Sequence, residues 1–375
     1  MKPKSIQVPR KRPISWGLLA LVAIISGVLG GAVALAMVAL MLWLCNRSWS
    51  VDDADSHGIS EFQSSRLGGI AVFLGGVAFF SVADWVTRAG GDSFGAFTSA
   101  GGELPSYASF ALLIGLVGLW DDFVARFKPT PRLVLVLAIS MGALLSDAVP
   151  MTASAYVWLP FGLNNPFALF IAGALVVTGF VNAGNMADGA NGLLGIVGLS
   201  FFCVLMSHGG ASFASIFIMS LLIFLVFNVV TGKIFLGDFG AYGLSAMIAF
   251  GSLELYSVGT VSSWFLGSLL AYPCIEMVRV IIVLSLQGSS PFKASNDHLH
   301  NYCYAFLRNR GWNHLVANST TGCLLGAASA LVPASLVLFG VLDPSSTATW
   351  GCYFAVYLVL HVSLVLQLRR VVNEE

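Results

Sequence analysis

The chain has 375 residues, of which 57% are hydrophobic and only 10% are charged, against about 25% charged residues in soluble domains. Together with a mean hydropathy of +0.86, this composition excludes an ordinary soluble domain and predicts an integral membrane protein. The 18 basic and 18 acidic side chains cancel, so no excess of positive charge indicates nucleic acid as a partner.

Apolar segments that approach the roughly 20 residues of a membrane-spanning helix recur along the whole chain. They predict an all-α, polytopic membrane bundle of about eleven transmembrane helices, forming one domain over residues 1–375 with a basic tail at 1–13. The predicted spans are 16–44, 68–86, 106–120, 132–149, 166–181, 192–208, 212–231, 240–256, 263–286, 319–341 and 349–368.

Polar residues gather in the odd-numbered connections between these spans. Odd connections all open on one membrane face, so their clusters can form one composite active site. The same connections carry most of the basic residues, whereas the even ones carry only Arg88, and the positive-inside rule therefore places the site at the cytoplasmic face. The basic tail disagrees, because eleven spans would leave it outside. The predicted site loops are 45–67, 121–131, 182–191, 232–239 and 287–318.

The most polar connection is a glycine-broken island from Asn182 to Leu193, with three Asn and one Asp. Such groups are costly at membrane depth unless they face a cavity or water. The island therefore predicts contact with a ligand or a metal ion.

Two acidic motifs favour phosphate or metal chemistry. Asp121 and Asp122 repel each other, so the pKa of one should rise unless a cation lies between them; this suits a general base, a divalent cation, or both. Asp238 stands on a glycine-flanked turn before a span, where a helix cap is the simpler interpretation. Phe235 could stack on a planar base or face lipid.

A histidine segment lies in the ninth connection. His298 and His300, with Asp297 and Lys293 nearby, predict a phosphate-contacting loop. Two histidines without a cysteine make a poor zinc site.

An ion pair and three histidines are interpreted as structural features. Glu276 and Arg279 in the ninth span have the i,i+3 spacing of a helical ion pair, which lowers the cost of burying both charges. His208, His314 and His361 have no chemical neighbourhood in the sequence, and we interpret them as structural residues.

Taken together, these motifs resemble the polyprenyl-phosphate N-acetylhexosamine-1-phosphate transferases, the glycosyltransferase 4 type superfamily that includes phospho-N-acetylmuramoyl-pentapeptide transferase. The resemblance covers about residues 57–301 and rests on five motifs in the same order. They are 65–69, 118–123, 182–193, 228 with 235–238, and 290–292 before 298–300.

The resemblance implies a phosphotransferase that moves a sugar 1-phosphate, of N-acetylhexosamine type, from a UDP-sugar to undecaprenyl phosphate or another polyprenyl phosphate. UMP would be released, and the product would start a surface polysaccharide or O-antigen lipid intermediate. The resemblance also implies Mg²⁺ as cofactor, with Mn²⁺ as an alternative, and a multi-pass position in the lipid bilayer of a bacterial inner membrane. No nucleic acid is expected, and a homodimer is compatible with this picture.

Carried over residue by residue, the resemblance implies Asp238 as the metal ligand and Asp121 as the base on the lipid phosphate. Asp122 would support the metal or the polar network of the catalytic site. It implies catalytic positions near the phosphates for His298 and His300. The implied substrate-binding residues are Arg66, Asn185, Asp188, Asn191, Asn228 and Phe235.

The chain also departs from the family pattern. Asn191 and Asn301 stand where many members carry Asp and His, and Ser295 stands where an acidic residue is common. Segment 62–69 replaces a lysine-containing motif of the peptidoglycan branch, which favours the polysaccharide branch and leaves the peptidoglycan branch as the alternative.

Two other classes stay open. A membrane transporter would need broken helices in two related halves with sites near the midplane, whereas the polar clusters here lie at predicted helix ends. An inactive scaffold of the same fold would not need the four aspartates that this chain keeps.

Overall fold

The computed structural model describes residues 16–47, 51–52, 64–90, 104–123, 129–149, 166–208, 211–290 and 295–374. Helices account for nearly all of these residues. Two short strands, β1 (Val51–Asp52) and β2 (Ser64–Ser65), pair in antiparallel orientation before the second helix. The expected all-α architecture is confirmed.

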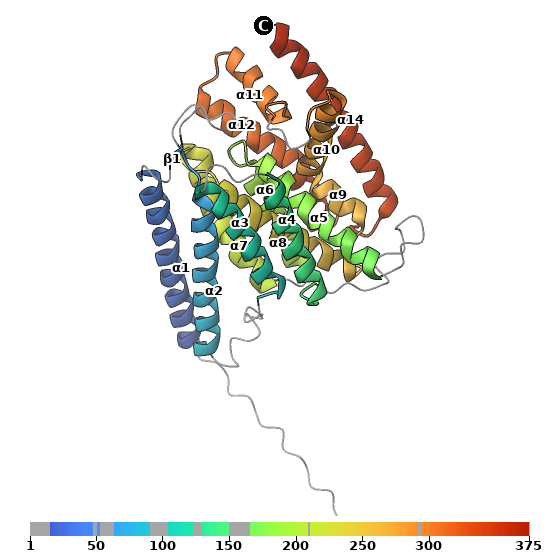
Figure 1. Cartoon of the computed structure of the whole chain (residues 1–375). Helices are drawn as coiled ribbons and strands as arrows, with labels where there is room; N and C mark the ends of the chain where they lie inside the picture. Colours follow the sequence, from blue (N-terminus) through green and yellow to red (C-terminus); the bar gives the residue numbers. More distant parts are fainter. Residues whose placement is uncertain are drawn as a thin grey trace, which may run out of the picture.

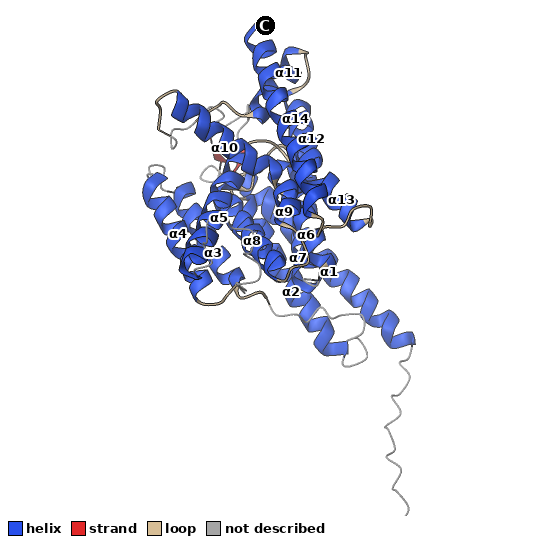
Figure 2. Cartoon of the chain, turned by 90° about the vertical axis from the view of Figure 1, so that its right-hand side faces the viewer, coloured by secondary structure: helices blue, strands red, loops and turns tan. Residues whose placement is uncertain are grey.

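The helices pack side by side over most of their length (Figures 1 and 2). A π-helical turn, η3 (Ala327–Leu331), joins two of them into one continuous rod. The α-helices are α1 (Trp16–Cys45), α2 (Gly68–Gly90), α3 (Tyr107–Phe123), α4 (Pro129–Leu145), α5 (Pro166–Ala187), α6 (Leu193–Ser207), α7 (Ala211–Thr231), α8 (Gly237–Ser257), α9 (Ser263–Leu269), α10 (Ala271–Leu286), α11 (Leu299–Asn309), α12 (His314–Gly326), α13 (Val332–Leu338) and α14 (Thr347–Glu374).

Six of the described helical segments are long and apolar enough to cross a membrane, and the pair α9–α10, bent by 82°, makes a seventh candidate. The chain is a multi-pass membrane protein, but the expected count of eleven spans is not confirmed. Helices α4 and α6 are apolar but shorter. Helix α8 is buried along most of its length, and because it contacts protein rather than lipid, it can carry Gly, Ser and Tyr.

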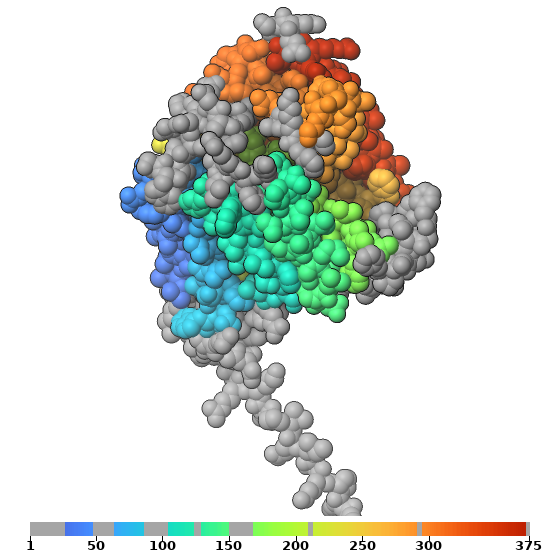
Figure 3. Space-filling model, viewed as in Figure 1, coloured from blue at the N-terminus to red at the C-terminus, as the bar shows by residue number. Residues whose placement is uncertain are grey.

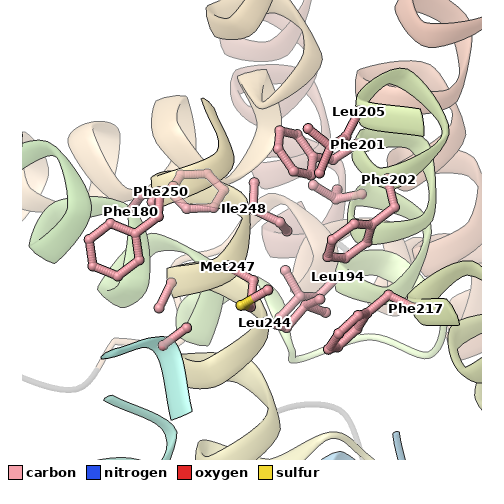
Figure 4. Close-up of a cluster of buried hydrophobic side chains, with 14 of the residues drawn as sticks. Phe180, Leu194, Phe201, Phe202, Leu205, Phe217, Leu244, Met247, Ile248 and Phe250 are labelled. Carbon is pink, nitrogen blue, oxygen red and sulfur yellow. The ribbon is translucent and has the colours of Figure 1, made fainter. Parts of the chain in front are cut away.

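The core lies around α8, which contacts α2, α3, α5 and α6. Figure 4 shows large apolar side chains of α5 to α8 interlocking there, and the rings of Phe202 and Phe217 stack with their centroids 5.1 Å apart. Because lipid tails are as apolar as these side chains, close packing rather than exclusion of water holds the helices together. Gly69 and Gly240 touch where α2 meets α8, and a Cβ on either would clash with the other.

Backbone hydrogen bonds join the segment before α2 to the segment before α8. Ser65 N–H donates to Lys233 O at 2.9 Å, Phe235 N–H donates to Ser65 O at 2.8 Å, and Gly68 N–H donates to Phe235 O at 2.9 Å. This pairing fixes the start of α2 beside the start of α8. Helices α11 and α12 and the C-terminal part of α14 form the upper end of the molecule in Figures 1 and 3.

Candidate active site

The last turn of α3 and the first turn of α8 meet in an acidic cluster. Asp122 Oδ1 accepts from the Asp238 N–H at 3.2 Å, and Asp122 Oδ2 accepts from the Phe239 N–H at 3.1 Å. Gly118, one turn before the pair, lies against the Asp238 backbone, and a Cβ at this position would clash with the Asp238 carbonyl oxygen. The two helix ends therefore approach because residue 118 has no side chain.

A third segment joins the cluster from the end of α5. Asp188 Oδ2 accepts from the Gly237 N–H at 3.1 Å. The first N–H groups of a helix lack partners within the helix and favour negative charge, and α8 receives these partners from Asp188 and Asp122. The helix-cap interpretation of Asp238 is therefore wrong: its carboxylate does not cap its own helix.

Asp188 lies in a crowded electrostatic environment. Burial raises the pKa of the Asp188 carboxyl well above its usual range, and the negative charges of Asp238 and Asp122 raise it further, while the Gly237 N–H lowers it. Three carboxylates so close together favour a cation in their neighbourhood.

Arg132 is one such cation, although it was not among the site residues predicted from the sequence. It lies in the first turn of α4, where its Nη1 forms an ion pair with Asp121 Oδ2 and lies 3.9 Å from Asp238 Oδ2. Its guanidinium sits over the ring of Tyr242, 5.5 Å from the ring centroid. Arg132 thus bridges α3 and α8.

Arg66 is the second cation. It lies in the segment between β2 and α2, and the left-handed backbone of Gly237 (φ 70°) packs against the Arg66 carbonyl, where a Cβ would clash. Burial lowers the pKa of the Arg66 guanidinium, whereas the charges of Asp238 and Asp122 raise it. The structure therefore places Arg66 next to the acidic cluster.

Two of the predicted substrate-binding asparagines hold backbone in place. Asn228 Oδ1 accepts from the Gly192 N–H at 2.7 Å, and its Nδ2 donates to Ile234 O at 2.6 Å. Asn191 Nδ2 donates to Ser319 Oγ at 3.1 Å. Both asparagines are buried, so they connect the island to α7 and α12.

The other two predicted substrate contacts lie closer to the surface. Asn185 is half-buried in the last turn of α5, and Phe235 is half-buried just before α8. Each is three residues from a member of the acidic cluster, Asp188 or Asp238, so all four residues lie at the same end of the bundle.

The predicted histidine segment adjoins the island. His300 Nε2 lies against Gly189, where a Cβ would be 2.5 Å from it, and His300 Nδ1 is 2.8 Å from Tyr272 Oη. Burial lowers the pKa of His300 to about 3, and the neighbouring His298 lowers it further, so this ring is neutral at pH 7. The rings of His298 and His300 stack with their centroids 5.1 Å apart.

The ion pair predicted within the ninth span is confirmed, since Arg279 Nη2 lies 2.6 Å from Glu276 Oε1. The interpretation of His361 as a residue without chemical neighbours is wrong. Its Nε2 lies 2.8 Å from Glu276 Oε2, a contact between residues 85 positions apart that no local sequence signal could reveal.

The described residues contain no group of three or more His, Cys, Asp or Glu side chains arranged to hold a metal ion. Magnesium in phosphate-handling sites is usually held by only one or two carboxylates, together with water and substrate phosphates. Both oxygens of Asp122 accept hydrogen bonds from backbone N–H groups, and Asp121 Oδ2 is paired with Arg132. Asp238 is therefore the carboxylate best placed to hold a magnesium ion of that kind.

A helical membrane bundle with carboxylates, two arginines and two histidines gathered at one end defines a membrane enzyme that handles phosphate groups. Residues 104–256 match the model of a protein family described as Glycosyl transferase family 4. The chain belongs to this family and is a phosphotransferase.

Proteins of two kinds are among its relatives. A phospho-N-acetylmuramoyl-pentapeptide-transferase of Fervidobacterium nodosum is 31% identical over 228 residues, which cover 56% of this chain and 72% of that protein. The corresponding transferase of Staphylococcus carnosus is 27% identical over 53% of this chain and 65% of its own length. A probable undecaprenyl-phosphate N-acetylglucosaminyl 1-phosphate transferase of Bacillus subtilis is 25% identical over 87% of this chain and 86% of that protein.

Proposed function

We propose that the protein transfers a sugar 1-phosphate, of N-acetylhexosamine type, from a UDP-sugar to undecaprenyl phosphate or another polyprenyl phosphate, and releases UMP. The observation that carries this proposal is the meeting of Asp121, Asp238 and Arg132 at one end of the bundle. A lipid phosphate and a nucleotide sugar are both anionic at their reacting ends, and such a transfer requires positioning and charge neutralisation more than covalent help.

We assign Asp238 as the residue that would hold Mg²⁺, with Mn²⁺ as a substitute. When bound, the ion would neutralise negative charge on the phosphates during the transfer. The carboxylate of Asp238 suits this role because the N–H groups at the start of its helix already have other acceptors.

Asp121 and Arg132 are assigned to the lipid phosphate. The Arg132 guanidinium, always protonated, can bind a phosphate oxygen, and a phosphate at this position would compete with Asp121 for it. Asp121 would then accept the proton of a singly protonated lipid phosphate. An oxygen of that phosphate attacks the sugar-bearing phosphorus, the bond to UMP breaks, and UMP leaves with the electron pair of that bond.

The remaining predicted residues are assigned to the nucleotide sugar. Asn185 and Asp188 would contact the uridine and Phe235 would stack on the base, while His298 and His300 would lie near the phosphates. Asn191 and Asn228 would act by holding the loops, since their side chains are engaged in the protein interior.

The polysaccharide branch is the better supported pathway. The relative that matches 87% of this chain is named as an N-acetylglucosaminyl 1-phosphate transferase, whereas the peptidoglycan relatives above match 53–56%. The identity of 31% to a phospho-N-acetylmuramoyl-pentapeptide-transferase keeps the peptidoglycan substrate as the second candidate.

A single assay tests both candidates. Purified protein is incubated with undecaprenyl phosphate, Mg²⁺ and either a panel of UDP-N-acetylhexosamines or UDP-N-acetylmuramoyl-pentapeptide, and UMP release is measured. We expect release with at least one UDP-N-acetylhexosamine and none with the pentapeptide substrate. Release with the pentapeptide substrate alone would assign the peptidoglycan branch, and no release with any donor would contradict the proposed function.

We further propose that the site faces the cytoplasm of a bacterial inner membrane. Single cysteines at Lys233 and Gln287, both exposed at the site end, should react with an impermeant thiol reagent only after the membrane is opened. Cysteines at Val258, directly after α8, and at Ala348, in the first turn of α14, both exposed, should react in intact cells. The reverse pattern would place the site outside.

A further inference from the structure

We propose that Glu276 and His361 are positioning residues that fix the orientation and tautomer of His298, whose ring stacks on that of His300. This inference rests on the proposed transferase function, in which His298 lies near the phosphates. Neither residue belongs to the motifs from which the site was predicted, and both lie outside the matched segment 104–256.

The carboxylate of Glu276 is the centre of a buried network. The side chain lies on α10 and is 2% exposed. Its Oε1 accepts from Arg279 Nη2 at 2.6 Å and from the Leu299 N–H at 3.0 Å, and it lies 3.3 Å from His298 Nδ1. Its Oε2 lies 2.8 Å from His361 Nε2. A buried charge within a membrane protein is costly and is retained where it has partners and a task.

The contacts determine which nitrogen of His298 carries a proton. Glu276 pairs with a guanidinium that is always charged, so it is ionised and can only accept hydrogen bonds. An imidazole nitrogen that approaches it must therefore be an N–H, which makes Nδ1 the protonated nitrogen of His298. In the neutral ring the unprotonated nitrogen is then Nε2, the one free to bind or accept a proton. A carboxylate that orients a histidine in this way is a recurring device in enzymes.

The same face of α10 orients the second histidine. Tyr272 lies one helical turn before Glu276, and its hydroxyl is 2.8 Å from His300 Nδ1. The two imidazole planes are nearly parallel, at 5° to each other. Two anchors on one helix thus hold two stacked rings, and His300 reaches Gly189 beside Asp188.

Helix α14 completes the arrangement from the C-terminal end of the chain. The side chain of His361 is fully buried. Its Nε2 contacts Glu276, whereas its Nδ1 has no hydrogen-bond partner among the described residues. Further along α14, Arg369 Nη1 lies 3.9 Å from Asp297 Oδ2, directly before His298. The C-terminal helix therefore holds both the carboxylate that orients His298 and the loop that carries it.

A matched pair of variants at His361 tests the role of this contact. His361→Gln keeps an N–H donor at the position of Nε2, whereas His361→Leu removes it at similar size. We expect the Leu variant to lose about 10–100-fold in kcat, the loss typical for removal of an orienting partner, with KM for the UDP-sugar changed much less. The Gln variant should retain most of the wild-type kcat.

Tyr107→Phe serves as the control for loss of a hydrogen bond elsewhere in the bundle. The Tyr107 hydroxyl donates to Glu254 Oε2 at 3.1 Å, and neither residue contacts the histidine segment. This variant should keep wild-type kcat, while thermal unfolding in detergent reports the stability of all three variants. If the folded His361→Leu variant kept wild-type kcat and KM, the hydrogen-bond network around Glu276 would serve only to stabilise the fold, and the proposal would be wrong.

A second measurement does not depend on turnover. In protein labelled with ¹⁵N at histidine, the ring of His298, assigned with a His298→Gln variant, should be protonated at Nδ1 and not at Nε2. Glu276→Gln replaces one acceptor oxygen by an N–H₂ donor, so one of the two imidazoles loses its acceptor, and kcat should fall at least as far as in His361→Leu. A His298 ring protonated at Nε2 in the wild type would overturn the proposal even if the enzyme is active.

The two levels of inference can fail separately. If the wild-type protein releases no UMP with any donor, the proposed function fails, and the NMR result alone decides whether Glu276 sets the tautomer of His298. If the wild type is active but neither His361→Leu nor Glu276→Gln alters kcat, the proposed function stands and the positioning role is refuted.

Discussion

The two ends of the α3–α8 pair are built very differently. At one end, Asp121 and Asp122 of α3 meet Asp238 of α8, with Arg132 between them. At the other end, a hydrogen bond from Tyr107 to Glu254 joins the same two helices. The two helices pack against each other along their length, so packing alone does not explain why charged groups gather at one end. The proposed reaction would explain them, and changing each end separately tests this.

The largest effect is expected at Asp238. Asp238→Asn removes the proposed magnesium ligand, and a loss on the order of 10²–10⁴ in rate is typical when an electrostatic stabiliser is removed. The fold should be unaffected, because the N–H groups at the start of α8 bind Asp188 and Asp122 instead. The measurements are UMP release and thermal unfolding in detergent. Near-normal turnover at saturating Mg²⁺ would exclude Asp238 as the metal ligand.

Substitution of Asp122, unlike that of Asp238, should lower stability as well as activity. Asp122→Ala removes the acceptor for two N–H groups at the start of α8, and loss of such a cap costs about 0.5–2 kcal/mol of stability. Activity should fall together with the melting temperature, because the turn that carries Asp238 is no longer held. Asp122→Asn, which keeps one acceptor oxygen, should recover part of the stability. Full activity and stability in the Ala variant would show that the cap is dispensable.

Features within one sequence motif could be predicted, whereas contacts between residues far apart in the sequence could not. The acidic motifs could be predicted because each stands at the end of an apolar segment, and the direction of successive helices places those ends together. The role of Arg132 could not be predicted, because its contact with Asp121 and Asp238 depends on the packing of α4 against α3. The assignments of Asn191 and Asn228 illustrate the same limit, since the side-chain amide of Asn191 donates to Ser319 Oγ and that of Asn228 bonds the backbone of Gly192, both far away in the sequence.

The carboxylate pair on α3 also predicts a pH effect. If Asp121 accepts a proton from the lipid phosphate, its help matters most below the second phosphate pKa of about 6, where that proton is still bound. Asp121→Asn should therefore lose proportionally more activity at pH 6 than at pH 8.5, measured as the variant to wild-type ratio of UMP release. An equal deficit at both pH values would indicate that Asp121 acts through its fixed charge beside Arg132, and the assignment as a base would be wrong.

The smallest effect is expected at the opposite end of the pair. Tyr107→Phe removes a single hydroxyl whose hydrogen bond to Glu254 contributes about 0.5–1.5 kcal/mol, the usual net value for one hydrogen bond. The ring itself remains, so its packing against Phe250, with the centroids 5.9 Å apart, is kept. The melting temperature should fall slightly and UMP release should stay within error of the wild type. A large loss of activity at this position would mean that the two ends are coupled through the helices, and the separation between a packing end and a chemical end would no longer hold.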